Sequence, residues 1–481
     1  MEKTKIILVN PPLTGKERYG ALAGGGLYMP PLGIASLAAF IRREGHSVKI
    51  LDCCALGLTI TQAAQIILSL KPEFVGITSA TLSINKAAVL AKALKGSNPD
   101  LKIIIGGVHV SSLPEETMNL FPQFDIGVLG EGERAVAELL KCSKDNYKPD
   151  GINGLIVREN NGLKLTGAQT FIEDLDSLPF PAWDLLPDLK KFYRPSSIGF
   201  KKLPAITVIT SRGCPMRCTF CSGTAFAKAY RAHSPEYVVS MVKALKTQFG
   251  IKELMIVDGA FLMNPRRVVN LCELMIKEKL DLSWSCSARI DVMRPEILRL
   301  MKKAGCWSIA YGIESGSQRV LDFIEKEIDL AKAPAVIKWT KEAGILAKGY
   351  FMLGHLTEDR VSIRDTRDFI LKNRFDLITV GYFTPLPGST DYERAPHYGK
   401  FNNNWDLLNL QTRVFLPRNL EAGTINSYRR KILREFYLRP KIFFRYSRLV
   451  FERGYFKIIF MGFISLLGSI FFDKPAHGPE N

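Results

Sequence analysis

The first 140 residues alternate short apolar runs with longer stretches in which apolar residues recur at helical spacing. Because such alternation builds a parallel sheet with helices on both faces, residues 1–142 are predicted to form a doubly wound, flavodoxin-like α/β domain. Its ligand crevice is expected at the carboxyl ends of the strands. Strands are predicted at Ile6–Asn10, Ser47–Leu51, Phe74–Thr78, Lys102–Ile105 and Ile126–Leu129, and helices near Leu32–Glu44, Ile60–Leu70, Asn85–Lys95, Pro114–Leu120 and Glu133–Lys141.

A second alternation covers residues 204–396 and follows a segment, residues 143–203, that is rich in Asn, Gly, Asp and Pro. We expect that segment to be a linker with some local structure. Six βα units in roughly 190 residues fall short of the ~250 residues of an eight-unit barrel, so a partial (β/α)6 barrel, open on one side, is predicted. Its strands are expected at Ile206–Thr210, Glu253–Asp258, Leu282–Cys286, Trp307–Gly312, Leu346–Leu353 and Leu377–Phe383.

Residues 397–481 are helical in pattern and basic, with ten Lys or Arg against two Glu between Ile425 and Lys457. The apolar run Ile458–Phe472 would span only about 22 Å as a helix against a hydrocarbon core of ~30 Å, so no transmembrane helix is predicted. Cations with interleaved aromatic residues suit the surface of an anionic bilayer. The alternative is a helical cap that packs on the barrel and leaves its Lys and Arg in water.

Length and composition narrow the class of protein. At about 150 residues per domain, 481 residues exclude a small disulfide-stapled scaffold, and ordinary Gly and Pro usage excludes low-complexity disorder. The net charge of +18 fits a phosphorylated cofactor, a membrane surface or nucleic acid. Nine Cys without a secretory segment indicate a reducing, cytoplasmic location, in which thiols are available as ligands.

Three of these thiols fall within eight residues, directly after the first strand of the second domain. Cys214, Cys218 and Cys221 therefore lie at the end of the barrel that carries active sites. Closely spaced thiolates suit iron–sulfur or zinc, but a closed zinc site takes four ligands and no further paired motif follows nearby. Three Cys on a four-iron cubane leave one iron open to a small-molecule ligand, which makes the cluster catalytic.

The spacing Cys-x-x-x-Cys-x-aromatic-Cys, with Phe220 as the aromatic residue, resembles the cluster loop of the radical S-adenosylmethionine superfamily. The segments at the later strand ends also resemble that family, although many relatives carry Asp where this chain has Gly259, and His355-Leu356 replaces a usual Leu-Pro pair. These segments are Val257–Phe261, Trp284–Asp291, Gly312–Ser317 and Phe351–Glu358.

The resemblance implies a 4Fe-4S cluster whose open iron binds S-adenosylmethionine, and an electron that releases a 5′-deoxyadenosyl radical. It also implies that Asp258 and Gly259 lie beside the methionyl end, and that Arg289 and Glu314 bind its polar groups. In the alternative interpretation Arg289 and Glu314 are an internal ion pair of the barrel, and Asp258 only ends its strand.

The first domain resembles the cobalamin-binding domain of one branch of that superfamily. The matching segments are Val9–Pro12, Pro30–Ala35, Gly45–Asp52, Thr78–Thr81, Gly106–Ser111 and Gly130–Glu133. A corrin over the strand ends requires close backbone approach, which is why glycine suits these loops. The residues expected to contact cobalamin are Gly106, Gly107, Gly130, Glu131 and Gly132, with Ser79 and Thr81 offering hydroxyls to its nucleotide tail. His109 either contacts the corrin edge or stabilises its loop.

Many cobalamin domains carry a cobalt-ligating His where this chain has Cys54. We therefore predict that neither His nor the nucleotide base ligates cobalt from below. The alternative interpretation is a doubly wound domain that has lost its cofactor.

Together these features predict a cobalamin-dependent radical S-adenosylmethionine enzyme, similar to the class B methylases and their relatives in tetrapyrrole and hopanoid biosynthesis. It would methylate an unactivated carbon of a small lipid, tetrapyrrole or natural-product substrate, with a flavodoxin or ferredoxin as electron donor and no nucleic acid partner. Three further functions stay open: a radical cyclase or rearrangement enzyme, a tRNA methylthiotransferase-like enzyme, and a non-enzymatic corrinoid carrier or sensor.

Overall fold

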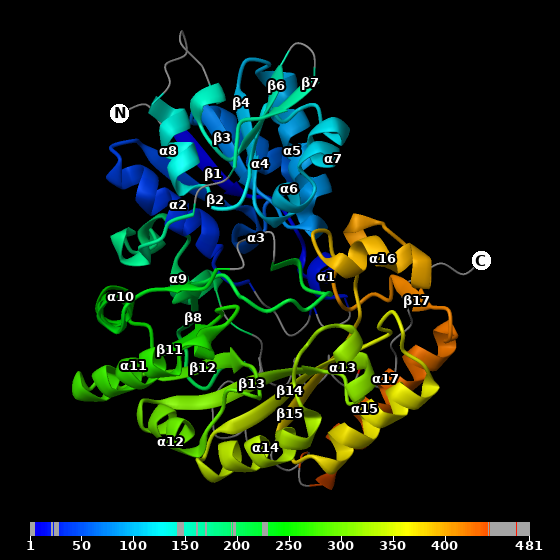
Figure 1. Cartoon of the computed structure of the whole chain (residues 1–481). Coiled ribbons are helices and arrows are strands. Elements are labelled where there is room, and N and C mark those ends of the chain that lie inside the picture. The colour runs from blue at the N-terminus through cyan, green and yellow to red at the C-terminus, as the bar shows by residue number, and fades with distance from the viewer. Residues whose placement is uncertain are drawn as a thin grey trace.

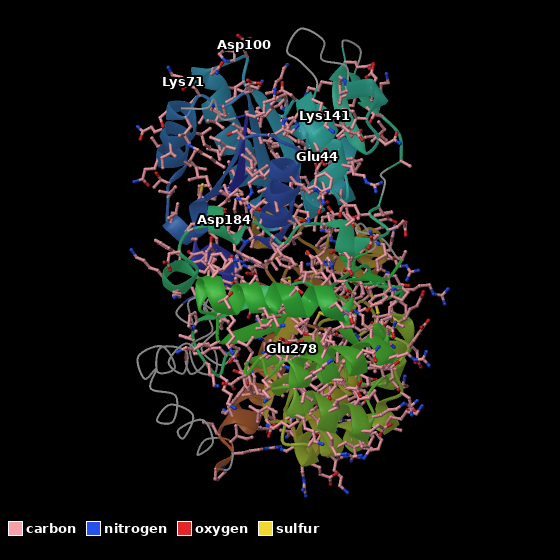
Figure 2. All side chains as sticks on the ribbon, turned by 90° about the vertical axis from the view of Figure 1, so that its left-hand side faces the viewer. Glu44, Lys71, Asp100, Lys141, Asp184 and Glu278 are labelled. Carbon is pink, nitrogen blue, oxygen red and sulfur yellow. The ribbon has the colours of Figure 1, made fainter. Side chains whose placement is uncertain are left out.

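The chain folds into two α/β halves that lie one above the other (Figure 1). The computed structural model describes residues 5–20, 23, 28–141, 149–159, 162–168, 171–193, 195, 199–223, 229–440, 442 and 468. A view turned by 90° shows the same two halves, with Lys141 and Glu44 on the upper half and Glu278 on the lower (Figure 2). Lys141 and Glu44 form an exposed ion pair at 3.0 Å, which joins the ends of two neighbouring helices.

The upper half is built around a seven-stranded sheet in the order β2-β1-β3-β4-β5-β6-β7. The first five strands are parallel and confirm the predicted doubly wound domain; they are β1 (Ile6–Asn10), β2 (Val48–Asp52), β3 (Phe74–Thr78), β4 (Lys102–Gly106) and β5 (Ile126–Val128). The helices are α1 (Gly15–Tyr19), α2 (Leu32–Arg43), α3 (Cys53–Leu56), α4 (Ile60–Ser69), α5 (Ile84–Ser97), α6 (Val108–Ser112), α7 (Pro114–Leu120) and α8 (Glu133–Lys141).

Alternation along β1 explains why both faces of this sheet are covered. Ile6 and Leu8 pack into one apolar cluster with residues of α2 and α8, whereas Ile7 and Val9 pack into another with residues of α4 and α5. Successive side chains of a strand point to opposite faces, so an uninterrupted apolar run requires helices on both sides.

The segment expected to be a linker contains a hairpin that continues the sheet. β6 (Leu155–Glu159) pairs antiparallel with β5, and β7 (Gly162–Leu165) pairs antiparallel with β6. Leu155, Ile156 and Val157 are buried, so this short apolar run is a strand although Asn, Gly and Asp surround it. Beyond the hairpin lie the short helix α9 (Leu189–Phe192) and two 3₁₀ turns, Leu175–Ser177 and Trp183–Leu185.

The lower half holds the predicted six-stranded parallel sheet, in the order β15-β14-β13-β12-β11-β8. Its strands are β8 (Ala205–Val208), β11 (Glu253–Ile256), β12 (Ser283–Ala288), β13 (Cys306–Glu314), β14 (Leu346–Leu353) and β15 (Leu377–Tyr382). A two-stranded ribbon, β9 (Ser211–Arg212) and β10 (Arg231–Ala232), precedes the first helix. The helices are α10 (Pro235–Phe249), α11 (Pro265–Lys277), α12 (Pro295–Lys303), α13 (Gln318–Phe323), α14 (Ala333–Glu342), α15 (Arg360–Lys372) and α16 (Thr390–Tyr398).

The C-terminal region is less helical than its pattern predicts. It begins with an antiparallel ribbon of β16 (Gly399–Phe401) and β17 (Phe415–Pro417), and the helix α17 (Ala422–Tyr437) follows. Residues 399–401 and 415–417 are strands instead of helix, because they pair with each other. The basic and apolar stretch from residue 443 onward lies outside the described residues, apart from residue 468. Among the helices that the structure describes, none combines the length and apolar content needed to cross a membrane.

This region connects the two halves. The Trp405 ring packs edge-on against His109 at 4.5 Å between ring centroids, and Asn85 donates to Asp406 at 3.0 Å. On the lower half, Arg367 of α15 binds Glu435 of α17 through two nitrogens. The described part of the C-terminal region therefore contacts helices of both halves. We call this part the C-terminal bracket.

The hairpin yields a prediction about stability. Leu155 is 0% exposed, whereas Leu165, in the same hairpin, is 50% exposed. We expect Leu155→Ala to lower the free energy of unfolding by about 2–5 kcal/mol, because it leaves a cavity in the core. Leu165→Ala should stay within about 0.5 kcal/mol of the parent protein. Urea unfolding midpoints measure both, and equal midpoints for the two variants would contradict the placement of the hairpin in the sheet.

Candidate cofactor and active site

A cavity of about 540 Å³ lies between the two halves, where the carboxyl ends of both sheets meet. Its upper wall comes from the loops after β3, β4 and β5, which include Ser79, Gly106, Gly107 and residues 130–133. Its lower wall comes from the ends of β8 and β11 and from the residues that lead into the cysteine loop: Val208, Ile209, Ser211, Arg212, Gly213, Val257 and Gly259. One cavity therefore joins the loops in which cobalamin and cluster residues are predicted.

The upper part of the cavity is an apolar slot against the sheet. β-strand residues line one side and residues of α2 and α8 the other, namely Ile6, Leu8, Gly76, Ile104, Val128, Leu32, Gly33 and Val136. A Cβ on Gly76 would lie 2.8 Å from a Leu8 methyl carbon, so glycine in the middle of β3 keeps this wall flat. A slot of this kind suits the apolar face of a planar group.

Two neighbouring glycines on the upper wall have different roles. Gly107 has a φ of +101°, and a Cβ there would lie 2.6 Å from the Ser79 carbonyl oxygen. Glycine is therefore required by the fold itself at this position. A Cβ on Gly106 would meet no atom within 4 Å, so the space beside its backbone belongs to the cavity. Gly106 is a position at which a ligand can touch the main chain.

The other predicted cobalamin residues divide into two groups. Ser79, Gly130, Glu131 and Gly132 line the cavity, whereas Thr81 and His109 do not. His109 is 0% exposed, its Nδ1 lies 3.2 Å from the Thr81 hydroxyl, and burial lowers its pKa to about 4. His109 is thus buried in contact with Thr81 and Trp405, which supports the second of its two predicted roles, that of stabilising its loop.

Cys54, at the position of the cobalt-ligating His, also lies away from the cavity wall. Its thiol is buried and donates to the Pro11 carbonyl at 3.1 Å, and burial raises its pKa to about 11. A protonated thiol that is already hydrogen-bonded is a poor metal ligand.

The strand that leads into the cysteine loop is fixed by Asp258. This buried carboxylate accepts hydrogen bonds from the Thr210 N–H and hydroxyl, both at 2.6 Å, and from the Ser211 hydroxyl at 2.7 Å. Burial raises the pKa of Asp258, and these hydrogen bonds oppose that shift. On the other side Arg267 donates to the Thr210 carbonyl at 2.9 Å. Both Asp258 oxygens are thus engaged in holding the entry to the cysteine loop.

The three thiols of the loop lie near one another. Cys214 is half-buried, Cys218 buried and Cys221 exposed, and a Cβ on Gly259 would lie 3.9 Å from the Cys214 Cβ. Gly259 therefore sits beside the first cysteine. Among the described residues, no three His, Cys, Asp or Glu side chains converge as the ligands of one metal ion would. Three spaced thiols suit the separate iron atoms of a cluster.

Two cations lie beside these thiols. Burial raises the pKa of the Cys218 thiol, while the charges of Lys326 and Arg289 oppose that shift. Lys326 lies 5.6 Å above the Phe220 ring and binds Glu314 at 3.0 Å, and Arg289 binds Asp291. Arg289 and Glu314 are thus not paired with each other, so the predicted alternative of an Arg289–Glu314 ion pair is wrong. Both remain close to the cysteine loop through separate partners.

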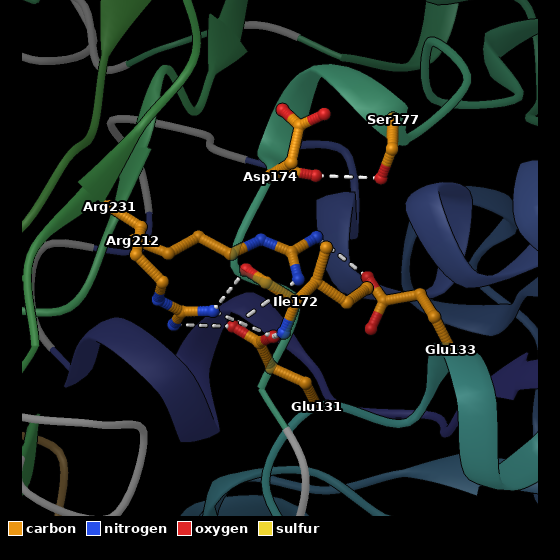
Figure 3. Close-up of polar contacts among 7 residues, drawn as sticks. All are labelled: Glu131, Glu133, Ile172, Asp174, Ser177, Arg212 and Arg231. Atoms are coloured by element: carbon orange, nitrogen blue, oxygen red, sulfur yellow. Dashed lines mark hydrogen bonds and ion pairs between the residues drawn. The ribbon is translucent and has the colours of Figure 1, made fainter.

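Four charged side chains join the two walls of the cavity (Figure 3). Glu131 accepts from two nitrogens of Arg231 at 2.8 and 3.1 Å, from Arg212 at 3.4 Å and from the Ile172 N–H at 3.0 Å. Glu133 accepts from Arg212 at 2.6 Å. Although burial alone would raise the pKa of Glu131, hydrogen bonds from Arg231 and the charge of Arg212 lower it. Glu131 was expected to contact the cofactor, and its carboxylate is occupied by these partners.

Sequence reasoning missed Arg212, Arg231, Glu133 and Lys326 as site residues. The one available signal was the position of Arg212, two residues before Cys214, in a strand that is otherwise uncharged. The Arg212–Glu133 and Arg231–Glu131 pairs join residues 79 and 100 positions apart in the chain, and no local pattern predicts such pairs.

Comparisons with known proteins identify the family of the chain. The radical SAM superfamily matches residues 208–370, and the B12 binding domain family matches residues 20–140. The chain is 35% identical to an uncharacterized methyltransferase of Pyrococcus horikoshii, over 92% of this chain and 94% of the relative. It is 28% identical to the anaerobic magnesium-protoporphyrin IX monomethyl ester cyclase of Rubrivivax gelatinosus, over 85% of this chain and 75% of the relative.

A solved structure shares the whole fold. The cobalamin-dependent S-adenosylmethionine radical enzyme OxsB, solved with aqua-cobalamin and S-adenosylmethionine bound, aligns with a TM-score of 0.73 at 19% identity. The alignment covers 97% of this chain and 72% of that one. The protein belongs to the radical SAM superfamily, in the branch that carries an N-terminal B12 binding domain. Its cofactors are accordingly a 4Fe-4S cluster, S-adenosylmethionine and cobalamin.

The two neighbouring glycines provide a matched test of the cobalamin site. We expect Gly107→Ala to destabilise the protein by about 1–3 kcal/mol, because its backbone conformation is open almost only to glycine. Gly106→Ala should keep the stability of the parent protein and weaken hydroxocobalamin binding by about tenfold, because its methyl group enters the cavity. Thermal unfolding and equilibrium dialysis measure the two effects. Unchanged cobalamin affinity in the Gly106 variant would contradict this location of the corrin.

Proposed function

We propose that the protein is a cobalamin-dependent radical S-adenosylmethionine methylase that adds a methyl group to an unactivated carbon of a small apolar substrate. The observation that supports this proposal is the single cavity shared by the glycine loops of the first half and the entry to the cysteine loop of the second. The relative from Pyrococcus horikoshii, which matches almost end to end, bears the name methyltransferase.

When bound, the cluster supplies the electron that cleaves S-adenosylmethionine, and cobalamin carries the methyl group. In our proposal Cys214, Cys218 and Cys221 hold the cluster. Lys326 and Arg289 place positive charge beside their thiolates. Asp258 holds the loop in position through Thr210 and Ser211, and Gly106 lets the corrin approach the main chain.

The walls of the cavity support an apolar substrate. Ile209 and Val257 follow β8 and β11, line the cavity and are 37% and 42% exposed. Met241 of α10 also lines it. Exposed aliphatic side chains beside a reaction centre bind apolar groups and keep water away from a reactive radical. A lipid, a tetrapyrrole or an apolar natural product fits this lining.

A radical cyclase is the second candidate, because one relative is a cyclase. A tRNA methylthiotransferase and a corrinoid carrier receive less support. A methylthiotransferase needs three cluster-binding cysteines in its first domain, but Cys53 and Cys54 are both buried, and Cys142 lies outside the described residues. A carrier without enzymatic activity would have no use for the three thiols of the cysteine loop.

The products distinguish methylation from cyclisation. A methylase consumes one S-adenosylmethionine to generate the radical and another to restore methylcobalamin, so it releases 5′-deoxyadenosine and S-adenosylhomocysteine in about equal amounts. We expect both products when the reconstituted protein is supplied with its substrate and a flavodoxin or ferredoxin as electron donor. Chromatography with mass detection measures them. Substrate-dependent 5′-deoxyadenosine without S-adenosylhomocysteine would favour the cyclase instead.

We also propose that residues 443–481 bring a cytoplasmic enzyme into contact with the inner face of the membrane. The support is compositional: cations and aromatic residues are interleaved up to Lys457, and the apolar run Ile458–Phe472 follows. Deletion of residues 456–481 is expected to move the protein from the membrane fraction to the soluble fraction of a cell lysate. An unchanged distribution would contradict membrane contact.

A further inference from the structure

The entry to the cysteine loop is held from two sides. From within the barrel, Asp258 binds Thr210 and Ser211, as described above. The next residue, Arg212, leaves the barrel and binds Glu133 at 2.6 Å and Glu131 at 3.4 Å, which belong to the first half of the chain. Cys214 follows two residues later. The last charged contact before the first cluster ligand is therefore made with the other half.

The partners of Arg212 belong to the loop that borders the cobalamin cavity. Glu131 and Glu133 alternate with Gly130 and Gly132, and all four residues line the cavity. Gly130 has a φ of +66°, and its N–H donates to the Ser111 hydroxyl at 2.9 Å. This loop is thus rigid on its own side, so a contact with it can position a segment of the other half.

The four charged side chains Glu131, Glu133, Arg212 and Arg231 are mostly buried, and their charges balance. The side chains of Glu131, Glu133 and Arg231 are 7%, 6% and 6% exposed, and that of Arg212 is 20% exposed. Arg231 pairs with Arg212 in the β9–β10 ribbon and donates to the Ile172 carbonyl at 2.7 Å. Two guanidinium groups therefore face two carboxylates. Buried charges are retained only when paired in good geometry, which makes the arrangement specific.

We propose that Arg212 is a positioning residue that couples the two cofactor sites, because it fixes the cysteine loop to the glycine loop of the cobalamin domain through Glu131 and Glu133. This inference rests on the proposed function and goes beyond it. Methyl transfer to a substrate radical requires that the cluster and the cobalt share one cavity at a constant separation. Arg231 holds Glu131 in place. Arg212 binds Glu131 in turn and so fixes the position of the loop that carries Cys214, Cys218 and Cys221.

The first test uses hydrogen exchange in the full-length protein without added cofactors. Arg212→Gln should accelerate amide exchange in residues 211–221, because this segment loses its contact with the glycine loop, and Glu133→Gln should accelerate the same residues from the other half. Residues 130–133 keep their contacts with Ser111 and Arg231. Arg42→Gln is the matched control, since it removes an exposed Arg–Asp pair that also joins segments far apart in the sequence. Exchange in residues 211–221 that stays at the parental rate in Arg212→Gln or in Glu133→Gln would overturn the proposal.

The second test uses protein loaded with cluster and cobalamin. Electron paramagnetic resonance of cob(II)alamin, recorded with the cluster oxidised and reduced, reports how strongly the two centres interact. In the parent protein and in Arg42→Gln, reduction of the cluster should enhance relaxation of the cobalt signal uniformly. In Arg212→Gln, iron and cobalamin contents should stay at parental levels while this enhancement falls several-fold and becomes heterogeneous. Arg212→Lys should recover part of it, because an ammonium group can pair with Glu133.

The outcomes separate the inference from the function on which it rests. A loaded Arg212→Gln protein with parental relaxation enhancement contradicts the coupling role, whatever its activity. If Arg212→Gln does not fold, Glu133→Gln answers the same question, because it removes the negative charge from the shorter of the two contacts and leaves Arg212 paired with Glu131. A parent protein that binds no cobalamin would count against the proposed function, and the exchange experiment would still decide the role of Arg212.

Discussion

The contact of two arginines with two glutamates between the sheets is the constraint on which the site depends. Most of the apolar core of each half lies within that half, and a few residues such as Ala35 and Trp405 share a cluster with the other part of the chain. The charged contact adds a specific, directional constraint to that apolar packing. Burying Arg231 and Glu131 costs several kcal/mol per charge unless both are paired, roughly as for other buried ions. The arrangement that satisfies all four charges is the one in which the carboxyl ends of the two sheets enclose the cavity.

In this arrangement the two halves contribute different parts of the site. The first contributes an apolar slot and glycine loops, where Gly107 is required by backbone conformation and Gly106 leaves room for a ligand. The second contributes three thiols on a loop whose entry is held by Asp258, and the cations Lys326 and Arg289 lie beside them. The C-terminal bracket closes a second side of the interface through Trp405 and His109. One cavity is thus bordered by the strand ends of both sheets, the charged contact and the entry to the cysteine loop.

Much of this was predictable from local patterns. All eleven parallel strands were predicted, because buried strands form apolar runs in the sequence, and the cysteine spacing alone predicts the cluster loop. The hairpin of β6 and β7 was not, since its single apolar run lies among turn-forming residues. The β16–β17 ribbon was likewise missed. The partners of Arg212 and Asp258 could not be predicted, because each pair is set by tertiary packing between residues distant in sequence.

Cys214, Cys218 and Cys221 hold, in our proposal, a four-iron cluster with one iron open to S-adenosylmethionine. The most direct measurement is the electron paramagnetic resonance spectrum of the reduced, anaerobically reconstituted protein, recorded before and after S-adenosylmethionine is added. We predict about four irons per chain and a spectrum that changes on addition, and loss of both when Cys218, but not the buried Cys272, is replaced by Ser. A cluster whose spectrum ignores S-adenosylmethionine, or iron that survives Cys218→Ser unchanged, would contradict the account.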